Sequence, residues 1–463
     1  MSLSNSNPSQ GEFRLAELLA TLSQALDMTE GQPRGHSVRS CWIGTRVGEA
    51  LKLETEEAFD LYYAILLKDL GCSTSAARIC AHYVTDDLTF KRNLSKLDGS
   101  LTQVLRFIIS HAGMNAGMTT KFRTIMKALR KGDNSSIEMV ETRCQRGAEI
   151  ARQMRFSERV AQTIIGLDEH WDGTGYPSRL SGDQIPRLSQ IALLSQLVDV
   201  FYTGGTKVEA LNAVVSRRGS WLSEEVVDAF LLAAEDPEFW AKLDNSDLIE
   251  EIYKFEPGQV QKNVDDEYLD DIAGAFAQVV DSKSPFTAGH SERVMMYTDL
   301  IAEKLDVDET HRRVLRRGAL LHDIGKLGVS NIILDKPGKL TDEEFEAIKL
   351  HPVHSEKILS QTSIFSNIIN VAVGHHERLD GSGYPNGLKG EEIDLDTRIV
   401  AVADIFDALT ADRPYRGAMT TDKAMGILKG MVPNQIDASC LAALEEVIAE
   451  FEDLPHLTSD QVA

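Results

Sequence analysis

The feature that most constrains the fold is an internal repeat. Three segments of the first half return in order in the second half: GHSVR as GHSER (35–39 and 289–293), LLKDLG as LLHDIG (66–71 and 320–325) and GLDEHWDGTGYP as GHHERLDGSGYP (166–177 and 374–385). The first two pairs are offset by 254 residues (289 − 35) and the third by 208 (374 − 166). Ordered matches of this length predict two homologous domains in tandem. The difference, 254 − 208 = 46, places about 46 extra residues in the first copy, within about 72–142.

Apolar spacing along the chain is typical of helices. Segments 13–26, 312–325 and 423–432 place apolar residues three and four positions apart, and strict apolar/polar alternation is scarce. The sequence therefore predicts an all-α fold with two homologous helical domains. The expected organisation is a disordered N-terminus at 1–11, a first domain at 12–255, an acidic connection at 256–271 that leads into a helix, and a second domain at 262–463.

Composition excludes several classes of protein. The chain has 463 residues, with 48 Lys and Arg against 71 Asp and Glu, so its net charge of −23 disfavours non-specific binding to long nucleic acids. A few local cations can still bind a small anion. The five cysteines form no CxxC pair, which fits a reducing compartment. The polar N-terminus and the lack of any run of about 18 apolar residues predict a soluble, cytoplasmic protein.

Histidines concentrate in the second half. Seven of the 12 histidines lie within 290–376, and two adjacent pairs stand out, His322–Asp323 and His375–His376. Successive side chains on a helix diverge by about 100°, so such pairs suit two neighbouring metals better than one. An Asp with two oxygens can bridge the metals, and imidazole with carboxylate favours Fe, Mn or Zn over Ca or Mg.

The second half resembles the HD-GYP phosphodiesterases. Six ordered motifs within 265–430 carry the resemblance: His322-Asp323-Ile324-Gly325-Lys326, His351-Pro352, His375-His376-Glu377, Asp380-Gly381-Ser382-Gly383-Tyr384-Pro385, Asp404-Ile405-Phe406-Asp407-Ala408-Leu409 and Arg413-Pro414-Tyr415-Arg416. The resemblance implies two helical domains of the HD type and a metal-dependent hydrolase. It implies a cyclic dinucleotide as substrate, chiefly cyclic di-GMP, which would be cleaved to pGpG or GMP.

The resemblance also assigns roles to individual residues. One divalent metal, Fe or Mn, would be held by His290, His322, Asp323 and Asp404, and a second by Asp323, His351, His375 and His376. Lys326, Arg413 and Arg416 would contact the substrate, together with the loop residues Asp380, Gly381, Gly383, Tyr384 and Pro385. Asp323 and Lys326 would be the catalytic pair. Family members with a third metal carry Glu at the position of Phe286, so a dinuclear centre is expected. Ser355 replaces the usual Gly, with no expected consequence for the metals.

The first copy lacks most of these ligands. His36 and Asp69 match His290 and Asp323, but the other five positions are replaced, by Lys68, Arg143, Leu167, Asp168 and Gln196, and Cys72 stands in place of Lys326. Two of the replacements are cations, which would repel a metal. The loop residues Asp172, Gly173, Gly175, Tyr176 and Pro177 persist. The first domain is therefore expected to be non-catalytic, with a regulatory, ligand-sensing or dimerising role.

Alternatives remain open at this stage. The tandem arrangement is similar to phosphodiesterases that act on 3′3′-cyclic GMP–AMP, which makes that dinucleotide the second candidate substrate. A non-catalytic regulator would bind a cyclic dinucleotide, or a diguanylate cyclase through its GYP loops. A homodimer is also open. A di-iron oxygenase is disfavoured by Lys326, Arg413 and Arg416, which suit a phosphate instead.

Overall fold

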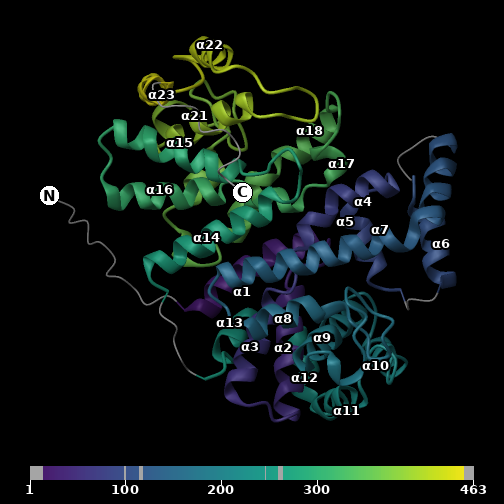
Figure 1. Ribbon diagram of the computed structural model, residues 1–463. Helices are drawn as coiled ribbons and strands as arrows, with labels where there is room; N and C mark the ends of the chain where they lie inside the picture. The colour runs from purple at the N-terminus through teal and green to yellow at the C-terminus, as the bar shows by residue number, and fades with distance from the viewer. Residues whose placement is uncertain (1–13, 98–100, 114–117, 246, 259–263, 453–463) are drawn as a thin grey trace. The chain divides into compact units, whose positions relative to one another are not determined.

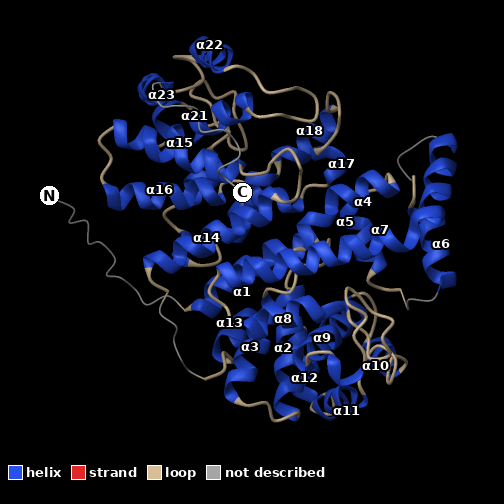
Figure 2. Ribbon diagram, in the orientation of Figure 1, coloured by secondary structure: helices blue, strands red, loops and turns tan. Residues whose placement is uncertain are grey.

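The described part of the chain folds into helices joined by loops. The computed structural model describes residues 14–97, 101–113, 118–245, 247–258 and 264–452, so the expected disorder at 1–11 lies outside the described residues. Figures 1 and 2 show helices along the whole described chain, and no strand occurs in those ranges. The predicted all-α fold is confirmed.

The helices have the following bounds. Through the first copy they are α1 Leu15–Thr29, α2 His36–Ala50, α3 Thr55–Leu66, α4 Ala76–Tyr83, α5 Asp87–Leu94, α6 Leu101–His111, α7 Met118–Gln153, α8 Glu158–Ile165, α9 Arg187–Thr203, α10 Lys207–Val215, α11 Glu224–Ala233, α12 Pro237–Leu243 and α13 Leu248–Lys254. Through the second copy they are α14 Asp266–Asp281, α15 His290–Lys304, α16 Glu309–Leu321, α17 Asn331–Leu334, α18 Asp342–Lys349, α19 His351–Leu359, α20 Ile369–Gly374, α21 Leu395–Thr410, α22 Thr421–Met431 and α23 Ala438–Glu452. Short 3-10 segments are η1 Cys72–Ser75, η2 Gly166–Asp168, η3 Gly182–Gln184, η4 Ile324–Gly328, η5 Ser363–Phe365 and η6 Gly390–Glu392.

Spatial contacts divide the chain into two compact units that interleave along the sequence. Unit 1 comprises residues 1–24, 35–68 and 151–272, and unit 2 comprises residues 25–34, 69–150 and 273–463. Two segments of the first copy therefore belong, by contact, to the unit that holds the second copy. This grouping follows packing rather than homology, so the sequence boundaries 12–255 and 262–463 stay a prediction.

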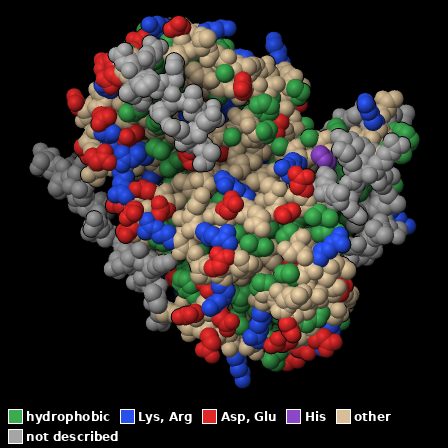
Figure 3. Space-filling view, viewed as in Figure 1, with side chains coloured by type: hydrophobic (Ala, Val, Ile, Leu, Met, Phe, Trp, Pro, Cys, Tyr) green, Lys and Arg blue, Asp and Glu red, His purple; other side chains and the backbone are tan. Residues whose placement is uncertain are grey.

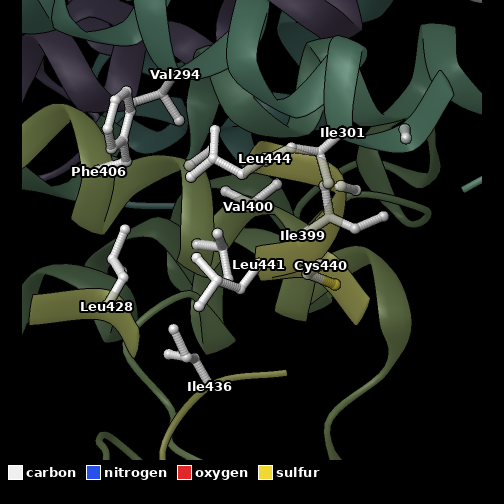
Figure 4. Close-up of a cluster of buried hydrophobic side chains, with 14 of the residues drawn as sticks. Val294, Ile301, Ile399, Val400, Phe406, Leu428, Ile436, Cys440, Leu441 and Leu444 are labelled. Atoms are coloured by element: carbon white, nitrogen blue, oxygen red, sulfur yellow. The ribbon is translucent and has the colours of Figure 1, made fainter. Parts of the chain in front are cut away.

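The core of unit 2 joins α15, α21, α22 and α23. Val294 and Ile301 of α15 pack with Val400 of α21, Leu428 of α22 and Leu444 of α23, and all five are buried (Figure 4). Truncating a buried Leu of this kind to Ala costs about 2–5 kcal/mol. The Asp394 side chain begins α21 by accepting a hydrogen bond from the Thr397 N–H at 2.8 Å. A rigid α21 matters because that helix carries two buried acids of the site described below.

Unit 1 has its own core, in which α2 packs against α3 and α9. The Trp42 indole N–H donates to the Phe239 carbonyl at 3.0 Å, and the Tyr62 hydroxyl donates to the Ile252 carbonyl at 2.9 Å. Both rings are fully buried, so these bonds satisfy polar groups that water cannot reach.

The surface fits the acidic composition. Figure 3 shows acidic and basic side chains intermixed over the face in view, with no continuous basic stripe. Among the described residues, no helix is both long and apolar enough to cross a bilayer.

Candidate metal centre

The predicted ligands come from the ends of four helices and the middle of a fifth. His290 begins α15 directly after Gly289, whose φ of +65° turns the chain into the helix. His322 and Asp323 follow α16, and His351 begins α19. The pair His375–His376 follows α20, and Asp404 lies within α21.

All seven side chains converge in two groups of donor atoms. One group is Asp323, His351, His375 and His376, the other is His290, His322 and Asp404, and within each group the donor atoms lie within 4.8 Å of one another. Sequence reasoning named all seven residues, and the structure brings them together.

Asp323 lies between the two groups. Its Oδ2 is 3.5 Å from His290 Nε2 and 3.3 Å from His322 Nε2. Its Oδ1 is 3.4 Å from His351 Nε2 and 3.6 Å from His375 Nε2. One oxygen thus faces each group, which is the arrangement that a bridging carboxylate requires.

Partners on the far side of the imidazole rings orient them. Nδ1 lies near an acceptor in four rings: 2.7 Å from Asp407 Oδ2 in His290, 2.6 Å from the Ala319 carbonyl in His322, 2.7 Å from the Ile348 carbonyl in His351 and 3.1 Å from the Ala372 carbonyl in His375. With Nδ1 as the donor, the neutral form of each ring presents Nε2 as an unprotonated ligand atom. Such outer partners commonly fix the tautomer of metal-binding histidines.

Three of the inward-facing atoms lack hydrogen-bond partners among the described residues. His290 Nε2, His322 Nε2 and Asp323 Oδ1 are buried and make no hydrogen bond within the described part of the chain. Leaving such groups unsatisfied costs about 1–3 kcal/mol each. Imidazole nitrogens and carboxylate oxygens are suitable donors for Fe, Mn or Zn. The residues present therefore fit a transition-metal centre.

Burial and charge tune the protonation of the centre. Burial lowers the pKa of His351 to about 3 and also lowers the pKa of His375 and of His376, which keeps these rings neutral. Burial opposes the charging of His290, but the neighbouring carboxylates of Asp323, Asp407 and Asp404 raise its pKa to about 9. The histidines and Lys326 hold the pKa of Asp323 well below its usual value despite burial.

The segment after Asp323 approaches α19 closely. A Cβ at Gly325 would lie 2.0 Å from the His351 carbonyl oxygen, so glycine is required there by space. The Gly325 N–H donates to Ser355 Oγ at 3.0 Å, and that hydroxyl lies 3.3 Å from the His322 carbonyl. Ser355, to which the sequence assigned no role, thus ties the segment to α19. Lys326 forms an ion pair with Asp323.

A buried glutamate organises the loop that presents Tyr384. Glu377 is 2% exposed and accepts the N–H groups of Asn386 at 2.7 Å and Leu388 at 3.0 Å. Gly381 has φ +80°, and a Cβ at Gly383 would lie 2.4 Å from the Glu377 Cα. The loop places the Tyr384 ring 4.7 Å from the His376 ring, centroid to centroid. Asp380 accepts the Ser382 N–H within the same loop, and a cis bond joins Tyr384 to Pro385.

The two predicted arginines differ in their surroundings. Arg416 donates to three carbonyls, those of Ala408, Leu409 and Gly417, at 2.7–3.0 Å. These bonds give Arg416 a role in bracing its own loop. The Arg413 side chain makes no hydrogen bond or ion pair within the described residues; its backbone pairs with Arg416.

The first copy retains the outer partners without the metal ligands. His36 Nδ1 lies 2.6 Å from Asp199, which also pairs with Arg39 at 2.5 Å. The trio matches His290, Asp407 and Arg293 of the second copy. There Asp407 lies 2.7 Å from His290 Nδ1 and 2.5 Å from Arg293 Nε. The ammonium of Lys68 lies 3.0 Å from His36 Nε2, the atom that corresponds to the inward-facing nitrogen of His290. A fixed cation therefore contacts the ring atom that would otherwise bind a metal.

Replacement of Lys68 by Ala should leave the metal content of the protein unchanged. Four other ligand positions of the first copy also lack the matching residue. They hold Arg143, Leu167, Asp168 and Gln196, none of which supplies the imidazole or carboxylate found at that position in the second copy. Metal analysis of the variant beside the wild type checks this. Loss of metal from Lys68→Ala would overturn the assignment of the centre to the second copy.

A further donor cluster in unit 2 is less suited to a metal. Glu30, Asp69 and Cys72 lie within 4.8 Å of one another, but Lys91 pairs with Glu30 at 3.0 Å. Burial raises the pKa of the Cys72 thiol well above its usual value. A protonated thiol beside an ammonium is a poor metal ligand.

Sequence reasoning missed the residues that orient the ligands. Asp407, Arg293, Glu377 and Ser355 contact the site from outside. The signal for three of them was present, because the offsets 254 and 208 pair them with Arg39, Asp199 and Glu169. Glu169 also accepts two loop N–H groups, those of Ser178 and Leu180. The repeat thus preserves these supports in both copies.

Comparisons with known proteins agree with this architecture. The model of the HD domain family matches residues 111–226 and 274–440. The 3′3′-cGAMP-specific phosphodiesterase 3 of Vibrio cholerae is 48% identical over 451 residues, which cover 96% of this chain and 98% of that protein. The cyclic di-GMP phosphodiesterase response regulator RpfG of Xanthomonas campestris is 40% identical over 180 residues, 38% of this chain and 48% of that protein.

A solved structure is similar over nearly the whole chain. The crystal structure of a cyclic GMP–AMP specific phosphodiesterase of V. cholerae, V-cGAP3, aligns with a TM-score of 0.65 and 43% identity. The alignment covers 96% of this chain and 99% of that one. With a family model that matches most of its length, a full-length relative and the HD and GYP motifs in place, this chain belongs to the HD domain family, in the HD-GYP group of cyclic dinucleotide phosphodiesterases.

Proposed function

We propose that this protein is a metal-dependent phosphodiesterase that hydrolyses 3′3′-cyclic GMP–AMP. The observation that carries the hydrolase proposal is the buried cluster around Asp323, in which three inward-facing atoms have no hydrogen-bond partner among the described residues. The sequence alone ranked cyclic di-GMP first. The relative that matches 96% of this chain is named for 3′3′-cGAMP, which supports reversing that order. Cyclic di-GMP is the second candidate, because the relatives named for that dinucleotide match a smaller part of this chain.

Two divalent transition-metal ions, Fe or Mn, would occupy the centre. The proposed ligands of one are His290, His322, Asp323 and Asp404, and of the other Asp323, His351, His375 and His376. When bound, such ions lower the pKa of a water and hold phosphoryl oxygens. Phe286 offers no donor atom to a third ion.

The remaining residues of the site would hold the anionic substrate. Lys326 already pairs with Asp323, so its ammonium lies next to the centre. Arg413 has a guanidinium available for a phosphate, and Arg416 would act by bracing the Arg413 loop. Tyr384 packs against His376 and would cover that side of the centre. Fixed donors of this kind stabilise charge that develops in a transition state.

Parallel turnover of the two dinucleotides tests the proposal. Protein reconstituted anaerobically with Fe or Mn is incubated with 3′3′-cyclic GMP–AMP and with cyclic di-GMP, and linear products are separated by chromatography. A higher kcat/KM for 3′3′-cyclic GMP–AMP is expected. A higher kcat/KM for cyclic di-GMP would reverse the order of substrates. Metal at full stoichiometry without any product would reject hydrolysis and favour a non-catalytic regulator that binds a cyclase.

Metal affinity should weaken in acid. His290, with its pKa of about 9, is protonated at neutral pH in the metal-free protein and must lose that proton to bind a metal. His351, with its pKa near 3, is already neutral and adds no dependence above pH 5. The apparent Kd for Mn²⁺ is therefore expected to rise about tenfold per pH unit from pH 8 to pH 6. Calorimetry in two buffers of different ionisation enthalpy should detect a released proton; a constant Kd over this range would contradict the scheme.

We further place the protein in the cytoplasm, where cyclic dinucleotide messengers act. The five cysteines are free in the structure, which suits a reducing compartment. A diguanylate cyclase partner and a homodimer remain compatible with the two GYP loops. Co-purification with a cyclase and the measured solution mass address these two points separately.

A further inference from the structure

The segment that carries Lys326 is held by a buried lysine. This segment, η4, follows Asp323 and leads through Val329 and Ser330 into α17. Lys283, just after α14, donates from Nζ to the Leu327 carbonyl at 3.1 Å, next to Lys326 in the chain. The Lys283 side chain is only 2% exposed. Its ammonium therefore needs a counterion within the protein.

The counterion comes from the first copy of the repeat. Asp87 lies at the start of α5, within the stretch where the sequence placed the extra residues, and its carboxylate is 3.5 Å from Lys283 Nζ. The other carboxylate oxygen accepts the Asn331 N–H at 2.9 Å and the Ser330 hydroxyl at 3.0 Å. Asp87 is fully buried and belongs to unit 2, as do all of its partners. It thus binds directly to the chain that continues from η4.

The charges around Asp87 keep it ionised. Burial by itself would raise the pKa of Asp87, but Lys283, Lys91 and the Asn331 N–H together hold the pKa below its ordinary value. Lys91, one turn along α5, donates to the carbonyls of Thr29 at 3.2 Å and Cys72 at 2.7 Å. A buried carboxylate paired with a buried ammonium is rigid, because moving either member leaves a buried charge unpaired.

A second part of the first copy packs on the same segment. A Cβ added at Gly328, the last residue of η4, would lie 2.2 Å from the Met28 methyl group. Met28 precedes Thr29 and Glu30, both of which bind Lys91. Residues 25–34 and α5 therefore support η4 as one connected group within unit 2.

We propose that Asp87 and Lys283 are positioning residues for η4, which makes the extra segment of the first copy a working part of the hydrolytic centre. The pair fixes the Leu327 carbonyl and the start of α17, and so fixes the backbone from which Lys326 reaches Asp323. The proposal rests on the proposed hydrolase function. It also means that the first copy is not solely regulatory, because part of that copy supports catalysis directly.

Two single variants and one double variant test the pair. Asp87→Asn keeps the shape and removes the charge, and Lys283→Met removes the donor at similar length. Each should lower kcat per bound metal at least about tenfold, because a displacement of about 1 Å near the chemistry can cost a hundredfold. Metal stoichiometry should stay within about twofold of the wild type, because the seven metal ligands are untouched. The double variant leaves no buried unpaired charge and provides folded protein if a single variant does not fold.

Hydrogen–deuterium exchange gives a readout that does not depend on activity. Amides of 324–334 should exchange faster in Asp87→Asn than in the wild type, while amides of α23 keep their rates. The matched control is Asp86→Asn, since Asp86 caps α5 by accepting the Thr89 N–H at 2.8 Å, and Asn caps equally well. This control should match the wild type in kcat and in exchange.

The outcomes distinguish failure of the positioning role from failure of the proposed hydrolase function. If wild-type protein turns over neither dinucleotide, the proposed function fails, and exchange in 324–334 still tests the positioning role. Unchanged kcat per bound metal in Asp87→Asn and in the double variant overturns the proposal. So does a uniform rise in exchange across unit 2 with unchanged kcat, since that pattern describes a purely structural pair.

Discussion

Asp323→Ala is expected to abolish turnover, with a loss of at least about a thousandfold in kcat/KM, or about 4 kcal/mol of transition-state stabilisation. One carboxylate faces both donor groups, with Oδ2 near His290 and His322 and Oδ1 near His351 and His375. Alanine removes both oxygens, so neither group retains its shared ligand. His322→Ala should act in the same direction by removing one imidazole. Metal analysis beside steady-state kinetics measures both effects.

A surface pair in the same unit provides the matched control. Asp396, near the start of α21, lies 2.8 Å from the exposed His311. Asp396→Ala also removes a carboxylate from a His–Asp pair, but exposed pairs contribute only about 0–1 kcal/mol to stability. This variant should keep its metal and its kcat/KM. Wild-type turnover by metal-loaded Asp323→Ala would show that the chemistry occurs elsewhere.

Glu377→Gln should lower kcat/KM by about ten- to a hundredfold through displacement of the Tyr384 loop. The buried carboxylate accepts the Asn386 and Leu388 N–H groups with its two oxygens. An amide has only one acceptor oxygen, so one buried N–H would then face an NH₂ group. Losing a charge-assisted bond of this type costs about 1.5–3 kcal/mol. Thermal unfolding and kinetics on the same preparation give the two quantities.

The first copy supplies a control with the same local chemistry. Glu169 is 1% exposed and accepts the Ser178 and Leu180 N–H groups at 2.6 and 2.9 Å. Glu169→Gln should destabilise its own loop to a similar extent and leave kcat/KM within about twofold, because no metal ligand cluster adjoins it. Equal losses of activity in the two variants would mean that the effect of Glu377→Gln is general destabilisation.

Apolar spacing was sufficient to predict the helical fold, whereas the ligand set came from the resemblance to a known family. Apolar spacing depends on helix geometry, and it predicted α1, α16 and α22 from the sequence alone. The adjacent pairs His322–Asp323 and His375–His376 indicated two neighbouring metals, and the resemblance to the HD-GYP phosphodiesterases supplied the full set of seven ligands. The donor atoms of all seven lie in the two groups around Asp323.

Support from distant segments could not be predicted in the same way. Asp87 and Lys283 are 196 residues apart (283 − 87), and neither lies in a motif, so only packing shows that they meet. The resemblance implied a substrate contact for Arg416, which stays a prediction, and only tertiary packing shows that its guanidinium also donates to nearby carbonyls. Residue type indicates what a side chain can bind, whereas tertiary structure determines which partner lies within bonding distance.

The Lys68 ammonium beside His36 has a consequence for cells short of metal. A covalently attached cation cannot be removed by a chelator or lost through dilution, whereas an ion held by imidazoles can be. Unit 1 should therefore keep the same fold and melting temperature through cycles of metal starvation and supply. Only the histidine-rich centre of unit 2 would register the change, which makes hydrolysis, and not the fold of unit 1, the quantity that follows metal availability.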